Sequence, residues 1–255
     1  MRTARRVLLI IAAGMWLMNA ARADDFLNAF DAANRLYVDG RFAEAADGYR
    51  AILQTGNFSE AIYFNEGNAL FRQGKIGLAI AAYRQAELLA PRDRDLRANL
   101  QFARTRARGG TAYHAPRLQS WLGRLSLNEW TALVAAGLWV FFVLLALSQW
   151  RRELGARLRI YWIVAGIFVV LAASGLAVEL NAQYFSKSAI VVVGETDVRN
   201  GPFDEAPSVY KVRDGAELSV ADRKDNWFQV VDSAMRTGWI KGSDVALFPP
   251  ENKGS

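Results

Sequence analysis

The sequence predicts a multi-domain protein, in which an all-α domain of helical hairpins precedes two transmembrane α-helices and a small all-β barrel. Three observations carry this prediction. The chain echoes itself at an offset of 34 residues before residue 108, two long uncharged apolar runs lie between residues 130 and 178, and short β-rich runs follow residue 188. Each pattern has the period or length of a different kind of structure.

The N-terminal segment has the three parts of a secretory signal peptide. Arg2, Arg5 and Arg6 precede an apolar run from Val7 to Met18, and Ala21-Arg22-Ala23 fits a cleavage site. We therefore expect a signal peptide over residues 1–23. Its removal would take away four arginines and no acidic residue, lowering the formal net charge from +6 to +2. The basic composition is then no argument for nucleic acid, and no nucleic-acid partner is expected.

Composition also argues against most catalytic chemistry. The 255 residues include no cysteine, and His114 is the single histidine. Thiol catalysis, thiolate metal sites and histidine-based triads or zinc clusters cannot be assembled within one such chain. The carboxylates are scattered. We expect no catalytic residue, no metal site and no cofactor, and a protein that is not an enzyme.

The helical segment, residues 24–108, repeats itself residue by residue. The matched pairs are Gly40 and Gly74, Ala45 and Ala79, Tyr49 and Tyr83, Arg50 and Arg84, Asn34 and Asn68, and Leu36 and Leu70. Apolar spacing predicts helices over Phe26–Val38, Phe42–Leu53, Glu60–Arg72, Ile76–Ala90 and Asp95–Arg108, with turns at Gly40 and Gly74. The last of these is expected to cap the stack. The run from Ile62 to Pro91 resembles the tetratricopeptide repeat, except that Glu66 stands where that family usually has leucine.

The resemblance implies that the first helix of each hairpin faces a peptide-binding groove. The corresponding residues are Phe30, Asn34, Tyr37, Phe64, Asn68 and Phe71. Family members clamp extended peptides with an asparagine at the positions of Asn34 and Asn68, since an amide both donates and accepts hydrogen bonds. Phe30 and Phe64 stand where a carboxylate clamp would carry lysine, which favours an apolar or aromatic peptide. The alternative interpretation is that the aromatic residues pack between helices and the asparagines lie on a polar face.

Two uncharged runs, Trp130–Trp150 and Ile160–Val178, are long enough to cross a bilayer, and we assign spans over residues 128–150 and 160–180. Residues 109–127 form the linker before them. The intervening segment, Arg151–Arg159, contains four arginines and is expected to be a cytoplasmic loop. With the signal peptide, this predicts a two-pass inner-membrane protein surrounded by lipid, with both terminal domains in the periplasm.

The C-terminal segment, Ser188 to Phe248, reads as a small β domain of about five short strands. Four of them are expected over Ala189–Val193, Glu217–Ala221, Trp227–Val231 and Gly238–Lys241. The motifs Val198-Arg199-x-Gly201-Pro202 and Gly238-Trp239-Ile240 resemble bacterial SH3 (SH3b) domains. That family binds cell-wall material or peptides, which implies a groove near Arg199, Asn200 and Tyr210 and a possible peptidoglycan ligand. Trp227 and Trp239 are expected in the core of so small a barrel.

The order of the parts over nearly the whole chain resembles the BatE-type proteins of aerotolerance operons. The resemblance implies protein partners in the membrane or periplasm, namely von Willebrand A-domain membrane proteins and a MoxR-type ATPase, in envelope or oxidative-stress maintenance. We expect a non-enzymatic scaffold with two interaction modules. The alternative is an accessory or regulatory subunit of a cell-wall hydrolase, which the SH3b domain targets to peptidoglycan.

Overall fold

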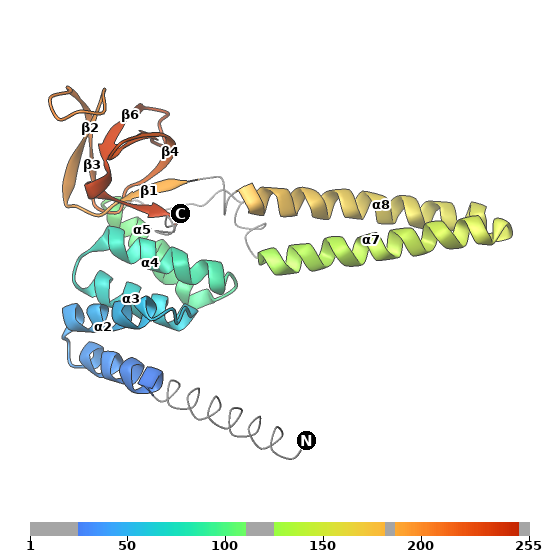
Figure 1. Ribbon diagram of the computed structural model, residues 1–255, viewed down its shortest axis with the longest axis horizontal. Helices are drawn as coiled ribbons and strands as arrows, with labels where there is room; N and C mark the ends of the chain where they lie inside the picture. Colours follow the sequence, from blue (N-terminus) through green and yellow to red (C-terminus); the bar gives the residue numbers. More distant parts are fainter. Residues whose placement is uncertain (1–24, 111–124, 182–186, 250–255) are drawn as a thin grey trace, which may run out of the picture.

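The computed structural model describes residues 25–110, 125–181 and 187–249 (Figure 1). The signal peptide expected over residues 1–23 lies outside the described residues, as do His114 and most of the linker expected over residues 109–127.

The helical domain, residues 25–110, contains every helix that the sequence predicts, and each end agrees to within one residue. A first helix over residues 25–38 is followed by α2 (Phe42–Gln54), α3 (Glu60–Arg72), α4 (Ile76–Leu89) and α5 (Arg94–Ala107). Gly40 and Gly74 turn the chain between the helices of each hairpin with φ of +78° and +80°. Only glycine adopts this conformation without strain, so the glycines repeat with the hairpins. Helix α5 buries Leu96, Leu100 and Ala103 against the stack and covers its end.

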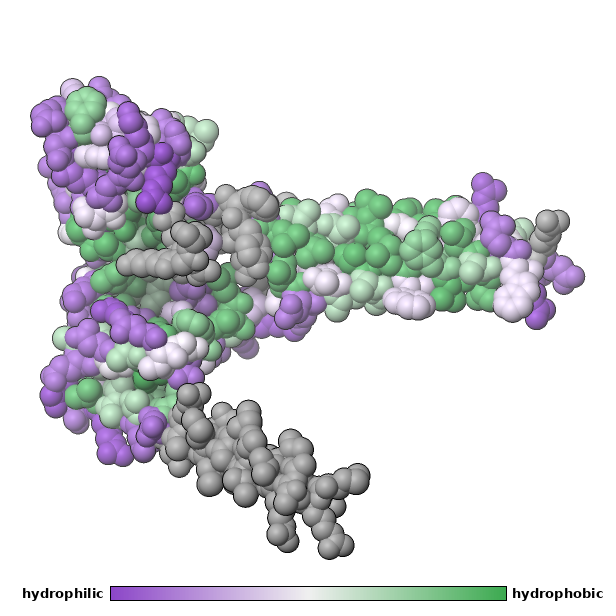
Figure 2. Space-filling view, in the orientation of Figure 1, coloured by the Kyte–Doolittle hydropathy of each residue, from purple (hydrophilic) through white to green (hydrophobic). Residues whose placement is uncertain are grey.

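Two apolar helices, α7 (Leu127–Trp150) and α8 (Arg152–Leu180), pack antiparallel along their length (Figure 1). Both are long and apolar enough to cross a membrane, judged by length and composition. Small residues let the helices approach closely: the Trp130 ring lies over Gly175, and Gly137 faces Phe168 and Val169. The face of this apolar hairpin seen in Figure 2 is mostly hydrophobic.

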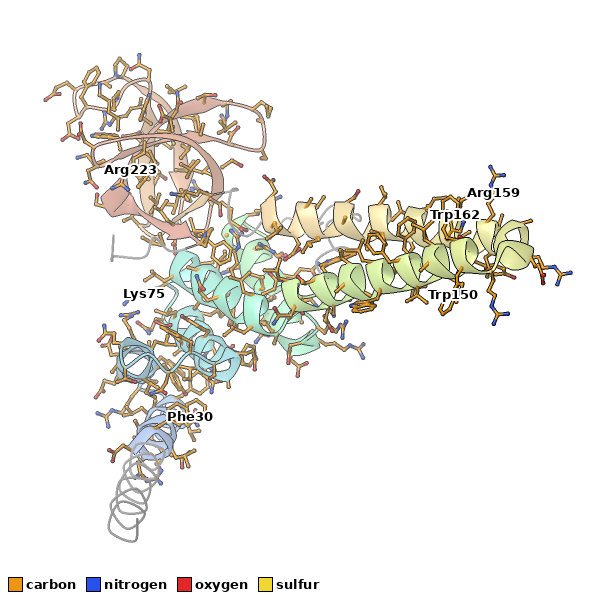
Figure 3. The ribbon with its side chains drawn as sticks, turned by 45° about the vertical axis from the view of Figure 1, so that its right-hand side comes forward. Phe30, Lys75, Trp150, Arg159, Trp162 and Arg223 are labelled. Atoms are coloured by element: carbon orange, nitrogen blue, oxygen red, sulfur yellow. The ribbon has the colours of Figure 1, made fainter. Side chains whose placement is uncertain are left out.

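The basic segment between the two apolar helices differs from the loop that the sequence suggested. Arg151 alone separates α7 from α8, and the remaining arginines of the segment form the first turns of α8. Arginine, leucine, alanine and glutamate are good helix formers, so the helix continues through the basic segment. Arg159 and Trp150 lie at the far end of the hairpin from the other domains (Figure 3).

The β domain, residues 188–248, is an antiparallel sheet with the strand order β3-β2-β6-β5-β4-β1-β7. Its strands are β1 (Ser188–Val191), β2 (Glu195–Arg199), β3 (Ser208–Arg213), β4 (Glu217–Lys224), β5 (Trp227–Val231), β6 (Thr237–Lys241) and β7 (Val245–Phe248). The sequence did not predict β2, β3 or β7. β2 and β3 are largely polar, and β7 has only four residues, so it is their pairing with neighbours that fixes these strands.

The β domain lies against the α4 and α5 end of the helical domain (Figure 1). Ile190 of β1 and Phe248 of β7 are buried in the core of the helical domain rather than in the core of the sheet. In a stack of helical hairpins, the second helix of a third hairpin would pack against α4 and α5. The β domain occupies that place and covers apolar surface that the last hairpin would otherwise expose.

Candidate functional site

A pocket of about 170 Å³ lies on the face formed by the first helix, α3 and α5. Its lining residues are Tyr37, Asn68, Phe71, Arg72, Tyr83, Asn99 and Phe102. Three of them, Tyr37, Asn68 and Phe71, were expected from the sequence. The volume is below the roughly 300–1,000 Å³ of small-molecule and cofactor sites, and suits a single inserted side chain.

The two asparagines are engaged in holding the helices together. The side-chain oxygen of Asn68 accepts hydrogen bonds from the Tyr83 hydroxyl at 2.8 Å and the Asn99 amide at 3.0 Å. One repeat earlier, Asn34 accepts from Tyr49 at 2.6 Å and from Asn65 at 3.2 Å. The same ladder therefore occurs twice, linking each first helix to its own partner and to the next hairpin. Asn34 also borders a second pocket, which lies along the C-terminal half of the first helix.

Phe30 and Phe64 do not line the pocket. Their rings lie 6.0 Å from the rings of Tyr49 and Tyr83, respectively, and both pack against the helical core. Burial of Tyr49, with a smaller contribution from Tyr37, raises the pKa of its hydroxyl to about 12. The hydroxyl therefore stays protonated and donates to Asn34 at any physiological pH. Phe30 and Phe64 thus pack between helices, as in the alternative interpretation of the sequence.

Sequence reasoning missed Arg72, Asn99 and Phe102. Phe102 is 63% exposed, and its ring lies 5.4 Å from that of Phe71, so the two form an open aromatic platform. The 34-residue period could have identified two of these residues. Asn99 lies one period after Asn65, and Phe102 lies one period after the expected groove residue Asn68. The guanidinium of Arg72 lies 4.3 Å from the centre of the Phe42 ring at the edge of this platform. An apolar side chain next to a carboxylate would match the pocket chemically.

Glu66, the departure from the repeat pattern, is buried between the hairpins. Arg50 of α2 donates to its carboxylate at 3.2 Å. Burial raises the pKa of Glu66, while the charge of Arg50 acts in the opposite direction. Arg84 lies one period after Arg50. Arg50 pairs with a glutamate of the next hairpin, Glu66, and Arg84 pairs with a glutamate of the β domain, Glu217.

The β domain supplies an acidic partner to the arginines of the last hairpin. Glu217 of β4 accepts two hydrogen bonds from Arg104, at 2.7 and 2.9 Å, and lies 3.4 Å from Arg84. Arg84 also donates to the Ser188 hydroxyl at 2.6 Å and lies 3.7 Å from the centre of the Phe248 ring. Burial acts to raise the pKa of Glu217, but the hydrogen bonds from Arg104 and the positive charges of Arg104, Arg84 and Arg108 outweigh it and hold this pKa below its ordinary value.

Asp214, in the turn before β4, caps a helix of the other domain. Its carboxylate accepts from the backbone amides of Ile76 at 2.8 Å and Gly77 at 2.9 Å, at the start of α4. The local residue Lys75 provides no side-chain cap, unlike Ser59 and Asp93 at the starts of α3 and α5. A Cβ atom at Gly77 would collide with the backbone oxygen of Val191, so this glycine permits the close approach.

The three residues expected at an SH3b groove do not form one surface. Tyr210 faces the sheet core at 8% exposure; its hydroxyl donates to the Arg236 carbonyl, and the Arg236 guanidinium covers its ring. Arg199 faces away from the core, opposite Trp239, and donates to the Ala206 carbonyl at 2.7 Å. The backbone amide of Asn200 donates to the Pro207 carbonyl at 3.1 Å in the same loop.

Trp227 and Trp239 are not core residues, which corrects the expectation from the sequence. On β5 and β6 the core positions are Phe228, Val230 and Ile240, and the tryptophans alternate with them on the outer face. The register places Trp239 opposite Gln229 and Trp227 opposite Lys241, whose amine lies 5.6 Å from the Trp227 ring centre. The outer aromatic face, defined as Trp227, Gln229, Trp239 and Arg199, is half-buried and combines flat rings with hydrogen-bonding groups.

Among the residues that the structure describes, no three His, Cys, Asp or Glu side chains are grouped so that they could hold a metal ion. The two surfaces described above present aromatic rings, amides and arginines, which are suited to binding.

Comparison with known protein families identifies both terminal domains. Residues 60–93 match the tetratricopeptide repeat, and residues 192–246 match the bacterial SH3 domain. None of the curated proteins compared with the chain matches it. The predicted fold class is confirmed: a tetratricopeptide-type helical domain, two apolar helices and an SH3b-like sheet, the first and last of which are non-catalytic interaction modules.

Proposed function

We propose that this protein is a non-enzymatic membrane scaffold, in which the apolar hairpin is a two-pass inner-membrane anchor and both interaction modules are periplasmic. SH3b domains are typically extracellular or periplasmic, which supports this side for residues 192–246. Because α7 and α8 are antiparallel, the helical domain and the β domain stand at the same end of the hairpin and on the same side of the membrane. The basic segment at the opposite end fits a cytoplasmic position.

The observation that carries this proposal is the open aromatic platform of Phe71 and Phe102 beside Arg72. A tetratricopeptide array presents such a face to peptides, and phenylalanine and arginine are both enriched at protein interfaces. The ligand would be a peptide segment with an apolar or aromatic side chain. Architecture favours partners of the BatE type, namely a von Willebrand A-domain membrane protein acting with a MoxR-type ATPase in envelope or oxidative-stress maintenance.

Affinity purification of the full chain from detergent-solubilised membranes tests the groove. Partners captured by the natural chain should be lost with Phe102→Ala and with Arg72→Glu, both of which change exposed side chains. Lys75→Glu, an equally exposed charge change just beyond α3, is the matched control and should keep them. Retention of every partner by the two groove variants would exclude the platform as the binding site. Alanine at Asn34 or Asn68 is a poor probe, since it would break the helix ladder.

A second function has its own observation, the outer aromatic face of the β domain. Tryptophan rings with adjacent amide and guanidinium groups can stack on sugars and bind peptide stems, so the protein would target a cell-wall hydrolase to peptidoglycan as its accessory subunit. The detergent-solubilised full chain should then sediment with purified peptidoglycan, and Trp239→Ala should abolish this. Trp150→Ala, at the far end of the hairpin, is the control tryptophan. A natural chain that stays in the supernatant rules out this second function.

A further inference from the structure

We infer that one end of the helical domain rests on the lipid surface, so that the tetratricopeptide array is held against the bilayer rather than standing free above it. The contact surface, called here the membrane-side end, consists of the start of the first helix, the turn between α2 and α3, and the turn between α4 and α5. This inference rests on the proposal that the apolar hairpin spans a membrane.

An ion pair fixes which end of the helical domain lies nearest the bilayer. Arg92, in the turn between α4 and α5, lies 2.9 Å from the carboxylate of Glu129 in the first turn of α7. Ser126 caps that helix in a capping box with Glu129, so the root of the apolar hairpin is well defined. The turn that carries Arg92 is therefore at the level where α7 would enter the lipid.

The other parts of the membrane-side end follow from the antiparallel run of the helices. The first helix, α3 and α5 begin at this end, and α2 and α4 finish there, whereas Gly40 and Gly74 turn the chain at the opposite end (Figure 1). Lys75, beside Gly74, lies away from the hairpin, as Figure 3 shows. The hairpin extends outward from the side on which the α4–α5 turn lies (Figure 1).

Exposed apolar side chains gather at the membrane-side end. The helical domain exposes five large apolar residues among those described, and three of them are at this end: Leu27, Phe58 at 64% and Leu89 at 52%. Of the other two, Phe102 lies on the groove platform and Val38 at the opposite end. The Phe58 ring stacks on Tyr63 at 6.5 Å between ring centres and still leaves most of its surface exposed. In water these residues gain nothing from exposure, but beside a bilayer they can enter the interface.

The membrane-side end also carries two arginines at the turn between α4 and α5. Arg94 is exposed, so its guanidinium group can reach lipid phosphates while its aliphatic part lies along the acyl boundary. Arg92, whose side chain is 61% exposed, adds positive charge at the same turn while it keeps its ion pair with Glu129. The ligand is thus the phospholipid surface of the bilayer that holds the hairpin. This contact would fix the orientation of the array relative to the bilayer. Its helices would stand upright on the membrane, and the groove would face sideways, toward a membrane-bound partner.

Nitroxide labels test this directly, since the chain has no cysteine of its own. Single cysteines would replace Asn57, beside Phe58, and Leu89. Val38, which is 83% exposed, provides the water reference and Val140, in the middle of α7, the lipid reference. The full chain would be placed in nanodiscs of phosphatidylethanolamine and phosphatidylglycerol. Accessibility to oxygen and to a polar nickel complex reports the depth of each label.

We expect the labels at positions 57 and 89 to favour oxygen over nickel, between the values at 38 and 140. Phe58→Asp should shift the label at 57 to the water value, whereas Val38→Asp should leave it unchanged. If positions 57 and 89 match Val38 while Val140 is deep, the inference is wrong and the membrane anchor stands. If Val140 is also exposed to nickel, the anchor itself is wrong and the inference falls with it.

Discussion

At the scale of single residues, the repeated asparagines show how one side chain can satisfy a family pattern and still serve the fold. Each of them accepts from a buried tyrosine and from an asparagine of the next hairpin. The oxygen that would bind a peptide is thus already used twice. In the function proposed above, binding at this face would fall to the exposed side chains around the asparagine, chiefly Phe102 and Arg72.

We predict that Asn68→Ala destabilises the second hairpin by about 1–3 kcal/mol, because the buried Tyr83 hydroxyl loses its acceptor. Native-state hydrogen exchange of the α3 and α4 amides measures this loss. Adding Tyr83→Phe to Asn68→Ala should recover part of it, since no unpaired hydroxyl then remains. Equal protection in the natural chain and in Asn68→Ala would show that the ladder contributes nothing.

At the scale of elements, α4 depends on a residue more than a hundred positions away for its N-terminal cap. Ile76 and Gly77 donate to Asp214, and Lys75 offers no substitute. The first backbone amides of a helix have no partner within it, so an external carboxylate satisfies them and also favours the positive end of the helix dipole. Folding of α4 and docking of the β domain are coupled through this contact.

Asp214→Ala should therefore cost about 0.5–2 kcal/mol and speed exchange of the amides in the first turn of α4. Asp214→Asn keeps an acceptor oxygen and should lose less. The amides of α3 are the internal control, because Ser59 caps that helix within its own sequence. A uniform increase in exchange over both helices would mean global destabilisation instead of the loss of a cap.

At the scale of the whole molecule, the β domain is joined to the helical domain by both apolar and charged contacts. Ile190 and Phe248 enter the helical core, and Glu217 pairs with Arg104 and Arg84. The lowered pKa of Glu217 stabilises the docked form above the ordinary carboxyl pKa of about 4.3, and this stabilisation is lost as the pH falls through the lower, folded value. Burial raises the pKa values of Glu87 and Asp214, while the hydrogen bonds from Ile76 and Gly77 act in the opposite direction at Asp214.

The docked form should therefore weaken as the pH falls below the ordinary carboxyl pKa and should open in strong acid. A spin–spin distance between cysteine labels replacing Lys75 and Lys224 reports the separation of the two domains. Glu217→Gln should already weaken docking at neutral pH and flatten the strongly acidic part of the profile. Glu195→Gln is the matched control, because Glu195 also has a lowered pKa but pairs with Lys211 within the β domain. An unchanged distance at every pH would show that Glu217 does not govern docking.

The agreement between sequence and structure varies with the range of the interactions involved. The five helices of the repeat domain were predicted to within one residue, because apolar spacing and the glycine turns are local signals. Strands β2, β3 and β7 were missed, and Trp227 and Trp239 were placed on the wrong face of the sheet. Only pairing with distant strands decides which face of a short strand is buried.

The sequence by itself determined the order and kind of the parts: a repeated helical hairpin, two apolar helices and a small β domain. These follow from periodicity, length and turn residues, which act between near neighbours in the chain. Only the tertiary structure decided that Asn34 and Asn68 hold the array together and that Phe71 and Phe102 form its open aromatic platform beside Arg72. It also decided that the β domain closes the array through Glu217 and Asp214. Each of these contacts joins separate elements, and a pairing between distant carboxylates, amides and arginines leaves no periodic trace in the sequence.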